Sequence, residues 1–143
     1  MLPGMALGSN AKLDLLRHVP LFEHCSKKEL QQIASIADEI DFPEGKRLIT
    51  EGERGREFFI LVDGTVEVRR SGRKLNVLGP GSFVGEVALL SQIPRTATVT
   101  TTSAVNVLVI TDQAFTALLG EQPAIAVKVA RTLAERIGET LIP

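Results

Sequence analysis

Glycine-interrupted strand patterns between residues 39 and 110 limit the fold of this chain more than any other feature. The runs between the glycines are rich in Val, Ile, Thr and Phe, which favour β-strands. They read EIDF, RLIT, EFFILV, TVEVRR, KLNVL, TATVTT and AVNVLVI. Seven or eight short strands in one segment predict a sandwich or barrel, and a jelly roll is the natural candidate.

Turn signals divide this segment further. Asp63-Gly64 in LVDGTVEV and Ser71-Gly72 in VRRSGRKLNV each predict a tight hairpin. The apolar residues of TVEV and NVLVI alternate, which predicts half-buried strands. The glycines of GPGSFVGE do not have the spacing of a dinucleotide fingerprint, and the first two predict a turn before a strand.

Helical patterns precede and follow the strands. Ser26 and Glu29 have the spacing of a capping box, and a shorter helix is expected over residues 10–17. Thr111 or Asp112 can cap a further helix. A long amphipathic helix then carries an apolar stripe made of Ile125, Val129, Leu133 and Ile137.

Composition agrees with a globular protein. The chain has 143 residues, of which 44% are hydrophobic, and this suffices for a buried core. We expect a single domain over residues 1–143, helical at 10–38, strand-rich at 39–110 and helical again at 111–140. The fold class is then mainly β with flanking helices, a β-roll with a C-terminal helix pair.

Charge and cysteine content exclude several function classes. The 16 basic and 17 acidic residues nearly balance, so the sequence gives no sign of the basic surface that nucleic-acid binding usually requires. The local basic group at 69–74 is interpreted as a solvated hairpin tip. Cys25 is the single cysteine, so an internal disulfide and an iron–sulfur cluster are excluded. We interpret Cys25 as a structural residue rather than as a nucleophile beside His24. No apolar run approaches the roughly 20 residues of a membrane span, so a cytoplasmic protein is expected.

The stretch GEVALLSQIPRTATV contains the candidate ligand-binding residues of the chain. If EVALL forms a helical turn after Gly85, its N–H groups can attract an anion. Arg95 can bring a planar fork of donors to the same place, which suits a phosphate. Glu86 would repel a phosphate but accept hydrogen bonds from hydroxyl groups. A ligand with both groups would satisfy both side chains; the alternative is an ion pair between Glu86 and Arg95, which is costly to bury.

The stretch GSFVGEVALLSQIPRTATV resembles the phosphate-binding cassette of cyclic nucleotide-binding domains. The segments VPLFEHCSKKELQQIA, FPEGKRLITEGERG, FFILVDGTVEV and LGPGSF also resemble the family, in family order, so the resemblance covers about residues 14 to 138. It implies a jelly-roll-like β-roll, a bound cAMP or cGMP, no other cofactor and no metal.

The resemblance also implies roles for individual residues. Arg95 would hold the cyclic phosphate together with backbone N–H groups, Glu86 would accept the ribose 2′-hydroxyl, and a hydroxyl at Thr96 can contact the phosphate or a guanine amine. The implied ligand-binding set is Gly85, Glu86, Val87, Ala88, Arg95, Thr96 and Ala97. Candidates for contact with the base are Asn76, Leu78 and Arg136.

Family members are switches rather than enzymes, so the resemblance implies that ligand binding moves the last helix against an effector or a second copy. The effector could be a channel, a kinase or a DNA-binding module within a longer protein. Two alternatives remain at the level of sequence. One is a ligand-free docking module of the same fold. The other is a cupin-like metalloenzyme, but this needs several metal ligands on strands, whereas His18 and His24 both precede them.

Overall fold

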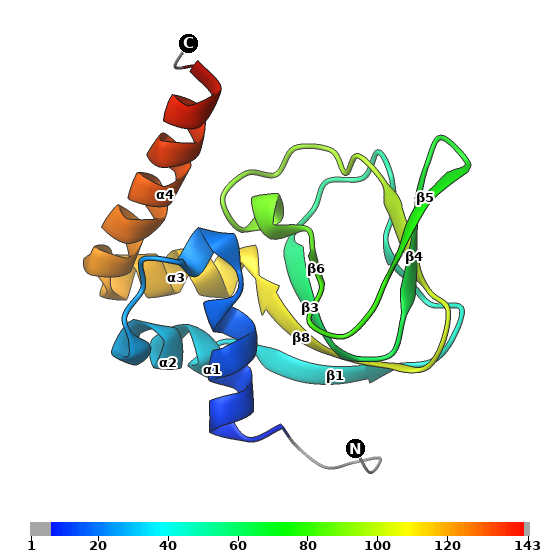
Figure 1. Ribbon diagram of the computed structural model, residues 1–143, viewed down its shortest axis with the longest axis horizontal. Helices are drawn as coiled ribbons and strands as arrows, with labels where there is room; N and C mark the ends of the chain where they lie inside the picture. Colours follow the sequence, from blue (N-terminus) through cyan, green and yellow to red (C-terminus); the bar gives the residue numbers. More distant parts are fainter. Residues whose placement is uncertain (1–6, 142–143) are drawn as a thin grey trace. The chain divides into compact units, whose positions relative to one another are not determined.

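The computed structural model describes residues 7–141, which form two compact units. The first, here called the strand unit, spans Ala37–Ala114. The second, the helical unit, comprises the described residues up to Ile36 and those from Phe115 onward. Figure 1 draws the strands in cyan, green and yellow, and the C-terminal helices in orange and red.

Two antiparallel sheets make up the strand unit. Their strand orders are β1-β8-β3-β6 and β2-β7-β4-β5 (Figure 1). The strands are β1 (Asp38–Phe42), β2 (Arg47–Ile49), β3 (Glu57–Asp63), β4 (Val66–Arg70), β5 (Arg73–Leu78), β6 (Phe83–Val84), β7 (Thr98–Thr101) and β8 (Val105–Thr111). A 3-10 turn, η2 (Glu86–Leu89), follows β6. The expectation of a mainly β fold with flanking helices is confirmed.

The core of the strand unit lies between the sheets. Each strand contributes alternate side chains to it, because successive residues of a strand point to opposite faces. The buried residues of this core are Ile49, Phe59, Leu61, Val66, Val99, Val105, Val107 and Val109. They come from both sheets, so burial of their apolar area holds one sheet against the other.

One predicted hairpin is confirmed and the other is wrong. Strands β4 and β5 pair up to Arg70 opposite Arg73, and the two turn residues, Ser71 and Gly72, have φ values of 53° and 76°. Positive φ at both positions is the hairpin turn that matches strand twist. The turn after Asp63 instead carries the chain from one sheet to the other, because β3 pairs with β6 and β8 whereas β4 pairs with β5 and β7.

Two further expectations about the strands need correction. Strand β8 is buried at every position from Val105 to Ile110, so it is not the half-buried strand that alternation predicts. The turn expected at Gly79 and Gly81 is confirmed, because strand β6 begins directly after it at Phe83. The helix expected to continue towards residue 38 ends at Ser35, because Asp38–Phe42 pairs with β8. In the two corrected cases pairing between distant segments overrides the local pattern.

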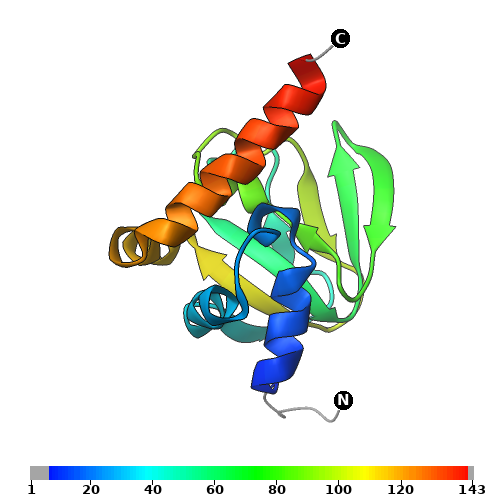
Figure 2. The ribbon, with the colours of Figure 1, turned by 60° about the vertical axis from the view of Figure 1, so that its left-hand side comes forward.

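The helical unit contains most of the helical residues. Its elements are α1 (Ser9–Arg17), the 3-10 turn η1 (Pro20–Phe22), α2 (Lys27–Ser35), the larger part of α3 (Asp112–Glu121) and α4 (Pro123–Leu141). Figure 2 shows α4 as a long helix in orange and red. The capping box at the start of α2 is confirmed: Glu29 N–H donates to Ser26 Oγ at 3.2 Å, and Ser26 N–H donates to Glu29 Oε1 at 2.8 Å.

Contacts within the helical unit join its two chain segments. The rings of Phe22 and Phe115 are fully buried, with centroids 5.9 Å apart. Lys128 Nζ on α4 donates to Glu29 Oε1 at 2.5 Å. Ile125 and Val129 of the predicted stripe are buried, whereas Ile137 is exposed. No helix within residues 7–141 has the length and apolar character needed to span a membrane.

Candidate functional site

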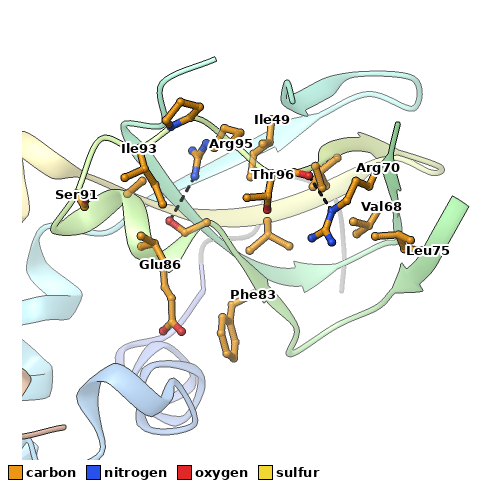
Figure 3. A pocket seen from close by; sticks show the side chains of 17 residues that line it. Ile49, Val68, Arg70, Leu75, Phe83, Glu86, Ser91, Ile93, Arg95 and Thr96 are labelled. Carbon is orange, nitrogen blue, oxygen red and sulfur yellow. Dashed lines mark hydrogen bonds between the residues drawn. The ribbon is translucent and has the colours of Figure 1, made fainter. Parts of the chain in front are cut away.

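A pocket of about 380 Å³ lies within the strand unit (Figure 3). Its wall is formed by one side of β4 and β5, by β6, and by the chain from Gly85 to Val99. Most of these side chains are apolar, and the volume lies in the range of about 300–1,000 Å³ that is usual for small-molecule sites. The two arginines in the wall are Arg70 and Arg95.

The turn η2 forms one part of this wall. Gly85 precedes it with φ 82° and ψ 20°, a left-handed conformation that favours glycine. Ala88 N–H donates to the Gly85 carbonyl at 3.0 Å, which closes the turn. The N–H groups of Glu86 and Val87 begin the turn and therefore have no acceptor within it. The helical turn expected in EVALL is confirmed.

Two glycines provide space for the guanidinium of Arg95. A Cβ atom on the buried Gly55 would lie 2.3 Å from Arg95 Nε, and one on Gly85 would lie 2.5 Å from Arg95 Nη1. Either methyl group would overlap the guanidinium in its present position. The side chain therefore occupies a slot between two stretches of backbone that only glycine leaves open.

Hydrogen bonds fix both the side chain and the backbone of Arg95. Its Nη2 donates to the Glu57 carbonyl at 2.6 Å, and its Nη1 donates to the Gly85 carbonyl at 3.4 Å. Arg95 N–H donates to the Glu53 carbonyl at 2.7 Å, and Gly52 N–H donates to the Arg95 carbonyl at 2.8 Å. The loop between β2 and β3 thus determines where Arg95 enters the pocket.

Burial lowers the pKa of the Arg95 guanidinium from its ordinary value, and the negative charge of Glu57 acts in the opposite direction. An arginine remains charged in proteins despite such a shift. The pocket therefore contains a partly desolvated cation, and an anion is a suitable partner for it.

Glu86 also lines the pocket, but its carboxylate points away from the Arg95 guanidinium (Figure 3). The two side chains extend in different directions from the segment Glu86–Arg95. An ion pair between them was the alternative to a ligand-binding role, and this orientation does not favour it. The guanidinium of Arg95 and the carboxylate of Glu86 therefore occupy separate positions.

The structure brings the cassette residues together. All seven predicted ligand-binding residues line the pocket: Gly85, Glu86, Val87, Ala88, Arg95, Thr96 and Ala97. Two base-contact candidates, Asn76 and Leu78, are not among the lining residues; Asn76 is exposed and Leu78 packs against the core. Arg136 belongs to the helical unit. Contact of these three residues with a base remains a prediction.

Sequence reasoning missed several residues of this site, and Arg70 and Gly55 are the two that bear on its chemistry. Arg70 was assigned to the solvated hairpin tip, yet it lines the pocket, two residues after Val68 on the same face of β4. The period of two along this strand could have indicated it. Gly55 was missed because its role depends on the approach of Arg95, which lies 40 positions further along the chain, and no local pattern reports such an approach.

Other candidate chemistry lies outside the pocket. Burial raises the pKa of the Cys25 thiol to about 11, so this half-buried cysteine is not activated as a nucleophile. Among the described residues, the group with the spacing of metal ligands is Glu23, His24 and Glu135. His24 Nε2 lies 2.9 Å from Glu135 Oε2. This group is on helical-unit segments, whereas a cupin-like enzyme needs ligands on strands.

The family model of the cyclic nucleotide-binding domain matches residues 39–122 of this chain. The chain belongs to the cyclic nucleotide-binding domain family. The match contains the whole of the pocket wall, including Arg95 and the turn η2. The chain is therefore a cyclic nucleotide-binding regulatory domain.

Individual proteins agree with this assignment. The chain is 39% identical over 114 residues to the cAMP-dependent protein kinase regulatory subunit of Mycosarcoma maydis, covering 73% of this chain and 22% of the relative. The solved N-terminal domain of a transcriptional regulator from Streptomyces coelicolor A3(2) is similar in fold, with a TM-score of 0.82, 29% identity and coverage of 90% and 95% of the two chains.

A third similarity is to the regulatory domain of Toxoplasma gondii PKA, solved with cAMP. Its TM-score is 0.71 and its identity is 31%, covering 77% of this chain and 44% of that one. The chain spans between 22% and 59% of the length of several curated relatives that it matches.

Proposed function

We propose that the pocket binds a purine 3′,5′-cyclic nucleotide, cAMP or cGMP, and that binding is transmitted by movement of α4 to an effector. The observation that carries this proposal is the guanidinium of Arg95, held in a slot of a mostly apolar pocket. Among the relatives, the Toxoplasma protein was solved with cAMP, which supports the same ligand class here.

The ligand's cyclic phosphate would lie against Arg95 and the N–H groups that begin η2. Arg95 already shares its Nη atoms with the carbonyls of Glu57 and Gly85, so its orientation is set before a ligand arrives. A pre-oriented donor loses little conformational entropy on binding. A charge-assisted hydrogen bond of this kind contributes about 1.5–3 kcal/mol.

The ribose would be held by Glu86 and the base by the apolar part of the wall. A carboxylate accepts a hydrogen bond from a 2′-hydroxyl and repels a phosphate, so the two ends of the ligand are distinguished by charge. Thr96 provides a hydroxyl beside Arg95, which can contact the phosphate or a guanine amine. A micromolar ligand needs about 8 kcal/mol in total, which these groups can supply together.

The regulatory step requires two conformations of the protein that differ in the position of α4, and the ligand must bind one of these conformations more tightly than the other. The relative from Mycosarcoma maydis is the regulatory subunit of a cAMP-dependent protein kinase. A further relative, 26% identical, is a CRP-like cAMP-activated global transcriptional regulator of Mycobacterium tuberculosis, and both names support a regulatory role here. Arg136 on α4 would contact the base in the ligand-bound arrangement. A longer regulator, or a second copy of the chain, would receive the signal.

Titration with a fluorescent cyclic nucleotide tests the site. Arg95→Ala and Glu86→Ala are expected to weaken binding about tenfold or more while the circular dichroism spectrum stays unchanged, because each removes one charged contact. Arg54→Ala is a matched control, since Arg54 is exposed and does not line the pocket. Unchanged affinity in either site variant would remove that residue's role.

A modified ligand separates the two side chains. In the unsubstituted protein, 2′-deoxy-cAMP should bind about tenfold more weakly than cAMP, and in Glu86→Ala this difference should disappear. Arg95→Ala should keep it. If neither cAMP nor cGMP raises the melting temperature of the protein, the domain is a docking module without a nucleotide ligand.

A further inference from the structure

A second guanidinium lies in the pocket wall beyond the seven cassette residues. Arg70, the last residue of β4, donates from its Nε to the carbonyl of Thr96 at 3.0 Å. Figure 3 shows this side chain on the side of the pocket away from Glu86, with Val68 and Leu75 beside it. The Thr96 carbonyl belongs to the residue after Arg95, so one short segment connects the two arginines.

The bond to Thr96 orients the planar guanidinium of Arg70. It is the one hydrogen bond that this side chain makes to the described residues, so both terminal nitrogens remain available as donors. Val68 and Leu75 give this part of the wall an apolar surface, and the Leu75 side chain is half exposed. A flat ring that lies on this surface would meet the terminal nitrogens of Arg70 at its edge.

Purine bases differ at the edge that such a pair of donors would contact. Guanine presents two acceptors, O6 and N7, and an arginine can bind both at once. Adenine presents the acceptor N7 beside an amino group, which is itself a donor and opposes one arm of the guanidinium. A fixed pair of donors therefore favours a 6-oxopurine over adenine.

We propose that Arg70 is a specificity-determining residue of this pocket, which contributes more to the binding of cGMP than to the binding of cAMP. This proposal rests on the proposed function, because it places a cyclic nucleotide in the pocket with its base against β4 and β5. In this arrangement Arg95 and Glu86 would hold the part that the two nucleotides share, and Arg70 would contact the part that differs.

The neighbouring arginine provides a matched control. Arg69 lies on the opposite face of β4, where its Nη1 donates to the Gly72 carbonyl at 3.0 Å and its Nε pairs with Glu67. Arg69 does not line the pocket. Arg69→Ala and Arg70→Ala thus remove the same charge from adjacent positions of one strand, and only the second removes it from the pocket.

Calorimetric titration of both variants with cGMP, cIMP and cAMP tests the proposal. The nucleotide cIMP has the 6-oxo group of cGMP without its 2-amino group, so a loss of cIMP affinity in Arg70→Ala cannot come from a contact to the 2-amino group. Arg70→Ala should weaken cGMP and cIMP about tenfold and cAMP by less than about threefold, whereas Arg69→Ala should change none of them.

Equal losses for all three nucleotides in Arg70→Ala would overturn the proposal, because Arg70 would then act only through the position of Thr96. Unchanged affinities would overturn it as well. Both results leave the proposed function intact as long as Arg95→Ala weakens every nucleotide. Failure of the unsubstituted protein to bind any of the three would instead refute the proposed function itself.

Discussion

The strand unit and the helical unit are stabilised in different ways. In the strand unit, backbone ladders connect eight described strands, and an apolar core fills the space between the sheets. Its functional cation, Arg95, is held by carbonyl groups of Glu57 and Gly85, which do not titrate. The geometry of the pocket therefore depends on packing and on the backbone, and little on the protonation of side chains.

Side-chain ion pairs have a larger part in the helical unit. Glu29 at the start of α2 accepts a hydrogen bond from Lys128 of α4 at 2.5 Å, and His24 lies 2.9 Å from Glu135, also on α4. These contacts join segments about a hundred residues apart in sequence. The position of α4 within its unit thus depends on groups that gain or lose charge with pH. The pocket and α4 are thus held in place by different types of interaction.

The largest effect is expected in the core of the strand unit. Leu61 is fully buried among residues of both sheets, so Leu61→Ala should lower the free energy of unfolding by about 2–5 kcal/mol. Urea denaturation followed by circular dichroism measures it. Leu75→Ala is the control, since half of that side chain is exposed and the change should stay below about 0.5 kcal/mol. If the two substitutions lowered the free energy of unfolding equally, the buried core would not be the main source of the stability of this unit.

A smaller, pH-dependent effect is expected in the helical unit. Hydrogen bonds from Lys128 and from the Ser26 backbone hold the pKa of Glu29 below its ordinary value of 4.5. Because this pKa is lowered in the folded state, Glu29 stabilises the fold above the unfolded pKa, and the contribution decreases as pH falls through the folded pKa. Glu29→Gln should lower the free energy of unfolding by about 1–3 kcal/mol at pH 7.

Glutamine can still close the capping box, so this variant removes the charge and keeps the cap. Urea denaturation at a series of pH values from 7 to 3 should show the difference between the parent protein and Glu29→Gln shrinking below about pH 4.5. A difference that stays constant over this range would show that the carboxylate charge does not stabilise the helical unit. Lys128→Met should remove the same pH dependence from the other side of the pair.

The smallest effect concerns the turn between β4 and β5. Ser71 has φ 53°, a left-handed conformation that costs energy for a residue other than glycine or asparagine. Ser71→Asn gives the Asn-Gly dipeptide that such hairpins prefer, and it should stabilise the protein by about 0.5 kcal/mol. The melting temperature measures this gain. A loss of stability would indicate that the Ser71 side chain makes a contact that asparagine cannot replace.

Local sequence signals predicted several parts of this molecule correctly. The capping box of Ser26 and Glu29, the hairpin through Ser71 and Gly72, and the helical turn after Gly85 each depend on residues close together in the chain. Their conformations follow from backbone preferences and from hydrogen bonds to neighbouring groups, which a single sequence contains.

The features that sequence did not predict depend on contacts between distant segments. The turn after Asp63 resembles a hairpin locally, but the partners of the flanking strands lie in two different sheets. The burial of β8 on both faces follows from tertiary structure, not from its alternating residues. Likewise, Arg70 and Gly55 enter the site only because the chain around Arg95 folds back onto them. A local sequence pattern indicates the conformation that a segment favours by itself. The structure at these positions is determined by tertiary contacts with distant segments.

Strand β5 ends the second sheet, so its outer backbone groups face no neighbouring strand in that sheet. Open edges of this kind favour intermolecular pairing, and exposed cationic side chains oppose it by repelling an identical edge. Arg73 and Lys74 are exposed at the beginning of β5, just before the exposed Leu75 and Val77. Arg73 and Lys74 therefore place positive charge on the open edge, where charge repulsion disfavours pairing of two copies through β5.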